Sequence, residues 1–438
     1  MGNIARLAIP MTLAQLINVL YNVVDRIYIG RIGEQAAYAF TGLGVCLPLI
    51  SAVIAFSNLI GMGGAALFSI ERGAKNTEEA AYIEGNSFTM LIITGILLTV
   101  LGYAFKRPAL YLLGASDATF PYADSYISIY FAGNIFVLLS LGLNSFINAQ
   151  GFGRIGMCTV AIGAGINIVL DPIFIFGLDM GVSGAALATI ISQFVSACWT
   201  VKFLTGERAV IKLCRRYMGV SAKRAAKIMS LGLSGFTMAI TNSMVQIMYN
   251  ANLQIYGGDV YVGVMTIINS VREVVQMPVF GVSQSAQPIM GFNYGAMEYD
   301  RVRKTIKYNS AVLIVYTVAA WALIFLFPHF FLGVFTKDPQ IMEAGERALH
   351  IYFFGFFFMA LQFSGQAVFT ALGFAKKAVF FSIFRKVIIV IPLIYLLPKI
   401  GSLGTDGIFM SEPISNIIGG ALCFAVMYFS VYRNLGRK

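Results

Sequence analysis

Long apolar runs recur along the chain, and short polar segments or segments containing glycine and proline separate them. A helix needs about 20 apolar residues to cross a hydrocarbon core of about 30 Å. The runs lack the sustained alternation that membrane-spanning β-strands require, so helices are predicted. The twelve predicted spans lie near residues 5–29, 43–70, 85–105, 122–149, 156–177, 181–204, 228–256, 261–291, 306–331, 346–372, 378–398 and 406–430.

The composition agrees with a polytopic membrane protein whose structure is all-α. The chain has 438 residues, of which 58% are hydrophobic and 12% are charged. A soluble domain has about 25% charged residues, so the composition argues against a water-soluble globular enzyme and against a disordered chain. The five cysteines are widely separated and there are only two histidines, so neither a disulfide framework nor a metal centre based on histidine is predicted.

The basic residues predict the orientation of the chain. If the N-terminus is cytoplasmic, about 21 of the 31 Lys and Arg residues fall in inside loops and tails, and about six fall outside. Both termini are then predicted to be cytoplasmic. The net charge of +11 is therefore explained by the membrane topology and not by a nucleic-acid partner.

The chain matches itself at an offset of about 222 residues. Residues 130–154 (YFAGNIFVLLSLGLNSFINAQGFGR) align with residues 352–376 (YFFGFFFMALQFSGQAVFTALGFAK). The repeating unit has six spans, so two six-helix lobes should be related by a pseudo-twofold axis along the membrane normal. We predict an N-terminal lobe over 1–204, a basic cytoplasmic loop over 205–227 and a C-terminal lobe over 228–438. Such repeats favour alternating access.

Two acidic residues lie inside predicted spans of the first lobe. Asp25 lies in span 1 and Asp171 in span 5. Neutral polar side chains lie on the same helices or on neighbouring ones: Asn18, Tyr21, Asn144, Asn148, Asn167 and Thr189. Helical spacing puts Asn18 and Tyr21 on the same helical face as Asp25. Carboxylates with neutral oxygens suit a proton or a hard cation such as Na⁺ between Asp25 and Asp171. Alternatively, Asp25 pairs with a neighbouring arginine and Asp171 caps a helix end.

The second lobe has a different set of polar residues. Its intramembrane charges are Arg272, Glu273, Arg385, Lys386 and Glu412. These charges could pair with one another. Alternatively, Glu273 or Glu412 could contribute to a second-lobe cavity that binds cations, together with Asn269 and Gln276. In the repeat, Glu412 lies opposite Thr189, whereas Ile247 and Leu393 lie opposite Asp25 and Asp171.

Several motifs are absent from the sequence. There is no glycine-rich phosphate loop for ATP, no His-Glu-x-x-His or Gly-x-Ser-x-Gly motif and no potassium-channel filter. An enzyme is therefore not expected. The loop over 71–84 also lacks the pattern of major-facilitator transporters. A sensor, or a channel without a transport cycle, is the alternative. Movement of substrate against its concentration gradient would exclude both.

Three segments are similar to those of a known family. Residues 22–33 (NVVDRIYIGRIG), 167–189 (NIVLDPIFIFGLDMGVSGAALAT) and 287–296 (QPIMGFNYGA) resemble signatures of the multidrug and toxic compound extrusion (MATE) transporters. The resemblance covers nearly the whole chain and is strongest to the bacterial branch that includes DinF-like and MepA-like proteins.

This resemblance implies a secondary multidrug antiporter that exports amphiphilic organic cations in exchange for H⁺ or Na⁺. It implies a monomer in the bacterial cytoplasmic (inner) membrane, with drugs and lipid as partners and no cofactor besides the coupling ion. It implies a coupling-ion site at Asp25, Asn167, Asp171 and Thr189, supported by Asn18, Tyr21 and Asn144, and a bend in span 1 at Pro10. The alternative is a flippase of lipid-linked oligosaccharides from the same superfamily, but the acidic first-lobe interior favours cationic cargo.

Overall fold

A computed structural model describes residues 2–29, 36–335, 339–401 and 403–436. Within these ranges, the side chains of residues 2–6, 19, 22, 23, 25–27, 29, 36, 37, 40 and 259 are not described. The described chain is helical and has no strands. Its helices are α1 (Gly2–Ile29), α2 (Ala36–Gly73), α3 (Thr77–Leu112), α4 (Phe120–Ala149), α5 (Gly153–Pro172), α6 (Gly181–Thr205), α7 (Ala222–Gly295), α8 (Tyr299–Leu326), α9 (Pro328–Gly333), α10 (Pro339–Phe353), α11 (Phe358–Ala371), α12 (Ala375–Ile383), α13 (Ile391–Leu396) and α14 (Gly404–Ser430).

Short turns of other helical types complete the list: the π-helical turns η2 (Ile173–Gly177) and η4 (Phe384–Val390), and the 3₁₀ turns η3 (Arg215–Tyr217), η5 (Leu397–Lys399) and η6 (Tyr432–Asn434). Each π-helical turn continues the helix before it, so α5 with η2 and α12 with η4, α13 and η5 form two longer helices. These two helices correspond to the predicted spans 5 and 11.

The helices confirm the predicted class of polytopic, all-α membrane protein. In the part of the chain that the structure describes, nine helices are long and apolar enough to span a membrane, and the pair α10–α11, bent by 47°, makes a tenth. The predicted spans 1 and 8 fall on α1 and on the second part of α7. Both contain charged residues, which lower their hydropathy. Residue Gly258 breaks α7 with φ 67° and ψ −163°, and this break separates the predicted spans 7 and 8.

The chain forms two compact units. The first unit is Ile9–Phe236, and the second is Met1–Ala8 with Thr237–Lys438. One boundary falls in the chain two residues before Pro10, within α1, and the other falls within α7. The basic segment 205–227 belongs to the first unit, in which it contacts the ends of α3 and α4.

Polar side chains hold this basic segment against the first unit. Gln150 accepts hydrogen bonds from the backbone of Val210 (2.7 Å) and Ile211 (3.3 Å), and it donates one to the carbonyl of Ile211 (3.0 Å). Asn86 donates to the carbonyl of Gly219 (2.8 Å) and accepts from the backbone of Ser221 (2.8 Å). These bonds satisfy backbone groups of a segment that lacks regular structure.

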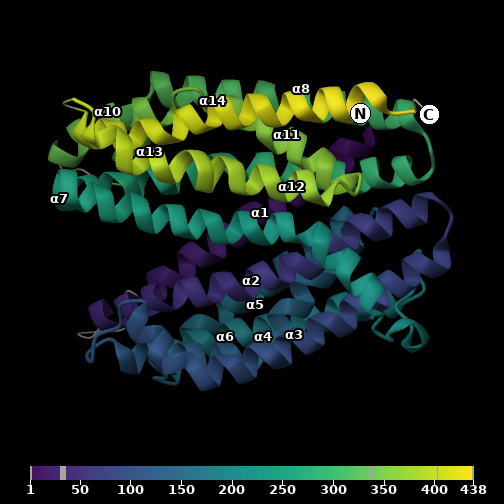
Figure 1. Cartoon of the computed structure of the whole chain (residues 1–438). Coiled ribbons are helices and arrows are strands. Elements are labelled where there is room, and N and C mark those ends of the chain that lie inside the picture. Colours follow the sequence, from purple (N-terminus) through teal and green to yellow (C-terminus); the bar gives the residue numbers. More distant parts are fainter. Residues whose placement is uncertain (1, 30–35, 336–338, 402, 437–438) are drawn as a thin grey trace. The chain divides into compact units, whose positions relative to one another are not determined.

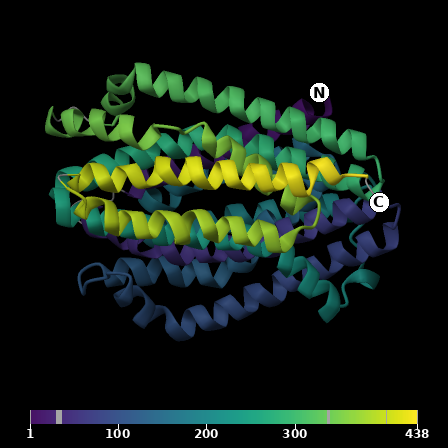
Figure 2. The same cartoon turned by 45° about the horizontal axis from the view of Figure 1, so that its top comes forward.

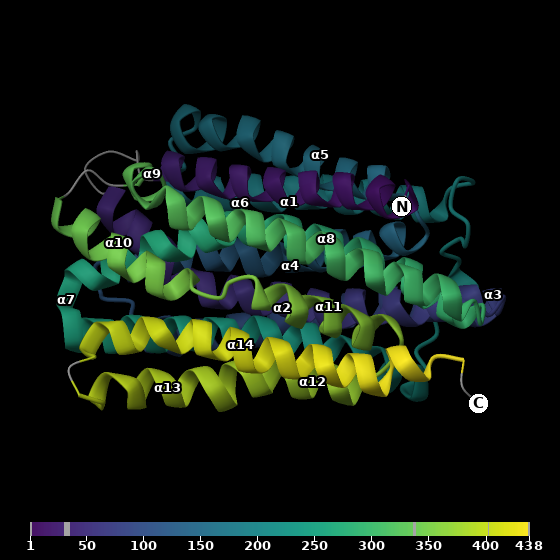
Figure 3. The ribbon, with the colours of Figure 1, turned by 90° about the horizontal axis from the view of Figure 1, so that it is seen from above.

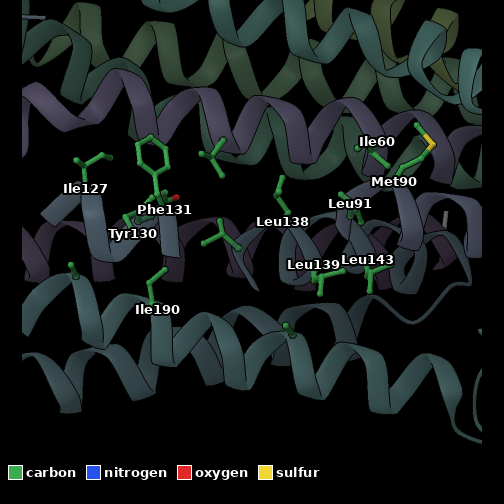
Figure 4. Packing of buried hydrophobic residues seen from close by; sticks show 14 of the residues in the cluster. Ile60, Met90, Leu91, Ile127, Tyr130, Phe131, Leu138, Leu139, Leu143 and Ile190 are labelled. Carbon is green, nitrogen blue, oxygen red and sulfur yellow. The ribbon is translucent and has the colours of Figure 1, made fainter. Parts of the chain in front are cut away.

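The core of the first unit lies between helices α2, α3, α4 and α6, which run side by side in Figure 1. Close packing is possible because small residues line the contacts. Figure 4 shows the buried side chains between these helices, including Ile60, Leu91, Leu138 and Ile190. The six-helix arrangement holds α5 and α6 against α4, and this positions the candidate site described below.

The second unit packs α14 between neighbouring helices. Helix α14 lies against α11 and alongside the helix formed by α12, η4 and α13 (Figures 2 and 3). Buried hydroxyls connect helices in this unit: Tyr249 of α7 and Ser411 of α14 lie 2.6 Å apart, as do Ser310 of α8 and Ser364 of α11. Each pair satisfies polar groups that water cannot reach.

The contact between α2 and the start of α7 yields a stability prediction. A Cβ atom at Gly232 would lie 1.7 Å from the carbonyl oxygen of Leu59, whereas a Cβ atom at Gly44 of α2 meets nothing within 4 Å. We expect Gly232→Ala to lower the free energy of unfolding by about 2 kcal/mol or more, because backbone atoms must move apart. Gly44→Ala is the control and should be neutral or slightly stabilising.

Thermal unfolding of the two purified variants in detergent, with tryptophan fluorescence as the readout, compares them directly. Equal melting temperatures for Gly232→Ala and Gly44→Ala would contradict this close approach of α2 and α7.

Candidate coupling-ion site

The candidate site lies where α5 ends. Asp171 is followed by Pro172, which has no N–H to continue the helical bonding pattern, and then by the π-helical turn η2. Such wide turns occur often at functional sites. Asp171 is fully buried in the first unit. The local sequence therefore places a carboxylate at an irregular point of a membrane helix, out of contact with water.

Three of the predicted site residues lie together across the interface between α5 and α6. The amide nitrogen Nδ2 of Asn167 lies 3.2 Å from Oδ1 of Asp171 and 3.4 Å from Oγ1 of Thr189. All three side chains are buried. The amide oxygen Oδ1 of Asn167 is buried and accepts no hydrogen bond from the residues that the structure describes. This oxygen and the Asp171 carboxylate are the ligand types that a hard monovalent cation prefers.

The next turn of α6 adds a polar pair that the sequence analysis missed. Gln193 lies four residues after Thr189, and its Oε1 accepts a hydrogen bond from the hydroxyl of Ser140 in α4. Ser140 is buried. The sequence does contain a signal for this pair, because Gln193 shares a helical face with Thr189 and is polar within an apolar span. The polar interior thus extends from α5 through α6 to α4.

Helix α1 runs past the same end of α5. The ring of Tyr28 packs edge to face on that of Phe176 in η2, with centroids 6.2 Å apart. Tyr21 lies within electrostatic range of Tyr130 in α4. The backbone of Asp25 lies in α1 between these two tyrosines, but its side chain lies outside the described residues. Asn18 and Tyr21 are half-buried and each interacts with a neighbour.

The predicted supporting residues Asn144 and Asn148 lie on α4 and face a different part of α5. A Cβ atom added at Gly156 would lie 3.2 Å from Oδ1 of Asn144 and 2.4 Å from Oδ1 of Asn148. Gly156 precedes Asn167 by three helical turns, roughly 16 Å along the axis. The structure therefore does not bring these two amides to Asn167. Their position at Gly156 depends on which turn of α4 faces α5, and helical periodicity alone does not determine this.

The charged residues of the second unit form a buried cluster between η4 and α14. Glu412 accepts hydrogen bonds from Nζ of Lys386 at 3.1 and 3.3 Å and from Nη1 of Arg385 at 3.2 Å. The same Nη1 donates to Oδ1 of Asn416. All four side chains are buried. Glu412 is thus ion-paired, as the first of the two interpretations expects, and its oxygens are occupied by cationic donors.

The other predicted second-lobe residues are not joined to one another. Arg272 donates to the hydroxyl of Tyr352 (3.0 Å) and not to its neighbour Glu273, which is exposed and has no ion pair among the described residues. Nδ2 and Oδ1 of Asn269 are buried and make no hydrogen bond within the described structure. Gln276 donates to the sulfur of Met359 at 3.2 Å.

The repeat relates the two polar interfaces. Thr189 on α6 corresponds to Glu412 on α14, and each side chain contacts the preceding long helix of its own unit. The α5–α6 interface contains the acid Asp171, whereas the interface of η4 with α14 contains two bases around one acid. Equivalent interfaces of the repeat therefore hold different charges, although the charged residues themselves do not occupy equivalent positions.

A family model decides the classification. The MatE model matches residues 10–173 and 234–396, which together make up most of the chain. The chain belongs to the MatE family. The two matched segments lie about one repeat length apart, as expected if each six-span half is one copy of the family's unit. This MATE transporter is therefore a polytopic membrane protein with the predicted twelve-helix fold.

Relatives and solved structures agree with this assignment. The multidrug export protein MepA of Staphylococcus haemolyticus is 25% identical over 424 residues, 96% of this chain and 92% of that protein. MepA of Staphylococcus aureus strain MSSA476 is 25% identical over 428 residues, 97% of this chain and 92% of that protein. An outward-facing multidrug resistance MATE family transporter of the MOP superfamily has a TM-score of 0.93 at 23% identity, over 100% of this chain and 96% of that chain. MATE in its bent conformation has a TM-score of 0.92 at 23% identity, over 99% and 96% of the two chains.

The buried ion pair of the second unit predicts a contrast between two glutamates. Glu412→Leu should lower the free energy of unfolding by about 3 kcal/mol or more, because Arg385 and Lys386 would stay buried without a carboxylate. Glu273→Gln, at an exposed position without an ion pair, should change it by less than about 0.5 kcal/mol.

Thermal unfolding in detergent measures both variants. A melting temperature for Glu412→Leu equal to that of Glu273→Gln would show that the buried pair does not stabilise this unit.

Proposed function

We propose that this MATE transporter is a secondary active multidrug exporter. It exchanges amphiphilic organic cations for H⁺ or Na⁺ across the bacterial cytoplasmic membrane, with both termini in the cytoplasm. The family assignment and the MepA relatives, which are named multidrug export proteins, support this function. The chain acts without an enzymatic step, as a monomer, and needs no cofactor besides the coupling ion.

The observation that carries the proposal is the buried Asp171 with its neutral partners. A carboxylate inside a membrane span is costly when ionised and uncompensated, so it favours a bound proton or a bound cation. Asn167 and Thr189 supply oxygens that can complete the shell of Na⁺, and Asn167 also donates to the carboxylate. The same group can therefore exchange a proton or Na⁺ with organic cations that need a negative partner.

The proposed cycle follows from competition for this charge. In the outward state, H⁺ or Na⁺ binds at Asp171 together with Asp25 and releases the drug. The ion-loaded carrier then turns inward, loses the ion and regains affinity for drug. Thermodynamic linkage requires the effect to be reciprocal, so bound drug must weaken ion binding by the same factor.

Pro10 is the proposed hinge of α1 in this cycle. Its missing N–H removes one backbone hydrogen bond, so α1 can bend there at a lower cost than elsewhere. The boundary between the two compact units passes between residues 8 and 9, close to this position. The arrangement supports a bend that moves Asp25 relative to α5.

A flippase of lipid-linked oligosaccharides is the second candidate. The buried cations Arg385 and Lys386 favour it, because lipid phosphates need positive partners. Asp171 argues for the exporter, because a buried carboxylate repels a phosphate. Movement of a lipid-linked sugar phosphate, without gradient-driven movement of an organic cation, would favour the flippase.

The test of the proposed function is efflux of ethidium from cells that make the protein. Asp171→Asn and Asp25→Asn should each lower the initial efflux rate by about tenfold, because the amide cannot exchange a proton or compensate Na⁺. Asp179→Asn is the matched control: this aspartate lies in the exposed turn after η2 and should support normal efflux.

Efflux is compared at equal amounts of protein in the membrane, with the pH gradient intact or collapsed. Gradient-dependent efflux at the wild-type rate in both the Asp171→Asn and the Asp25→Asn variants would contradict the assignment of the coupling site.

A further inference from the structure

The interface between η4 and α14 contains more positive charge than its own acid can compensate. Arg385 and Lys386 are 8% and 3% exposed, and both donate to the single carboxylate of Glu412. Arg272 also interacts electrostatically with Glu412. In the described part of this cluster, three cations thus surround one anion. Uncompensated charge is costly inside a membrane span, so this cluster would stabilise a further anion.

The backbone around Arg385 is shaped to hold its side chain across α14. A Cβ atom added at Gly419 would lie 2.9 Å from Cγ of Arg385, so only glycine leaves room for the arginine stem. The stem passes this glycine, and the guanidinium reaches Glu412 and Asn416. The wide turn η4 supplies both neighbouring bases, Arg385 and Lys386, to the same carboxylate.

The guanidinium of Arg385 keeps one edge unused. Its two hydrogen bonds, to Glu412 and Asn416, both come from Nη1. Nε and Nη2 donate to none of the residues that the structure describes, although the side chain is more than nine-tenths buried. These two nitrogens present parallel N–H groups, and this geometry matches the two oxygens of a carboxylate.

We propose that this cluster binds the carboxylate of a zwitterionic cargo, with the Nε and Nη2 edge of Arg385 as the bidentate donor and Lys386 as the second positive partner. The inference rests on the proposed export function and gives amphiphiles that carry a carboxylate as well as a cationic group an additional anchoring point in the second unit; cations without a carboxylate bind without it. Glu412 positions the two bases, and Arg272 adds to the positive field.

A matched pair of dyes tests the proposal. Rhodamine B carries a cation and a carboxylate, whereas its ethyl ester carries the same cation and no carboxylate. Fluorescence polarisation with the purified full-length protein in detergent gives Kd for each dye. We expect Arg385→Gln to raise Kd for rhodamine B by about tenfold. This is the loss of affinity expected when one charge-assisted hydrogen bond is removed. Kd for the ester should change by less than about twofold.

Two further variants keep the result interpretable. Lys386→Gln leaves the ion pair of Arg385 with Glu412 in place and should also weaken the binding of rhodamine B but not that of the ester. It therefore replaces Arg385→Gln as the test variant if Arg385→Gln does not fold. Lys377→Gln removes a cation from α12, where Nζ contacts the Ser430 hydroxyl at 2.8 Å and not this cluster, and it should affect neither dye.

The outcomes separate this inference from the proposed function. Arg385→Gln and Lys386→Gln proteins that bind both dyes as the wild type does, or that lose both dyes equally, would overturn the carboxylate site. A wild-type protein that binds the ester but not rhodamine B would overturn it and leave export of cations intact. Binding of neither dye would contradict both proposals.

Discussion

The interior of the bilayer cannot hydrate a polar side chain, and this constraint shapes both units. An ionisable group that is buried within a span needs a polar or charged partner. In the first unit Asp171 meets the amide of Asn167, and in the second Glu412 meets two bases. Asn167 in turn reaches Thr189 of α6, and Glu412 reaches the bases of η4, across interfaces where Gly184 and Gly419 allow close approach. The glycines therefore allow the helices to come close enough for the polar positions to meet.

The internal repeat puts these polar contacts on equivalent helices but gives them different chemistry. The pair formed by α5 and α6 and the pair formed by η4 and α14 each contain a π-helical turn near their polar residues. In the first unit the acid lies on the long helix, at Asp171. In the second unit the acid lies on the following helix, at Glu412, and the long helix supplies Arg385 and Lys386. A duplicated fold thus holds one interface centred on a carboxylate and one with more bases than acids.

The sequence predicts the helices well, because each apolar run is long enough to cross the bilayer and charged or small residues separate the runs. Helical spacing also predicts that Asn167 lies one turn from Asp171, and the family resemblance implies that Thr189 joins them. The sequence does not predict that Asn144 and Asn148 lie at Gly156, because helical period determines the face of a residue and not the depth at which two helices meet. The pairing of Arg385 with Asn416 likewise depends on the register of η4 against α14 and on the space at Gly419.

Coupling between the buried carboxylate and the movement of an organic cation is the central claim. Ethidium transport in proteoliposomes, under a Na⁺ gradient or a pH gradient imposed separately, measures this coupling directly. We predict that at least one gradient drives ethidium against its own concentration difference, and that Asp171→Asn abolishes this uphill movement. Movement only down the ethidium gradient under both conditions, or uphill movement unchanged in Asp171→Asn, would contradict the claim.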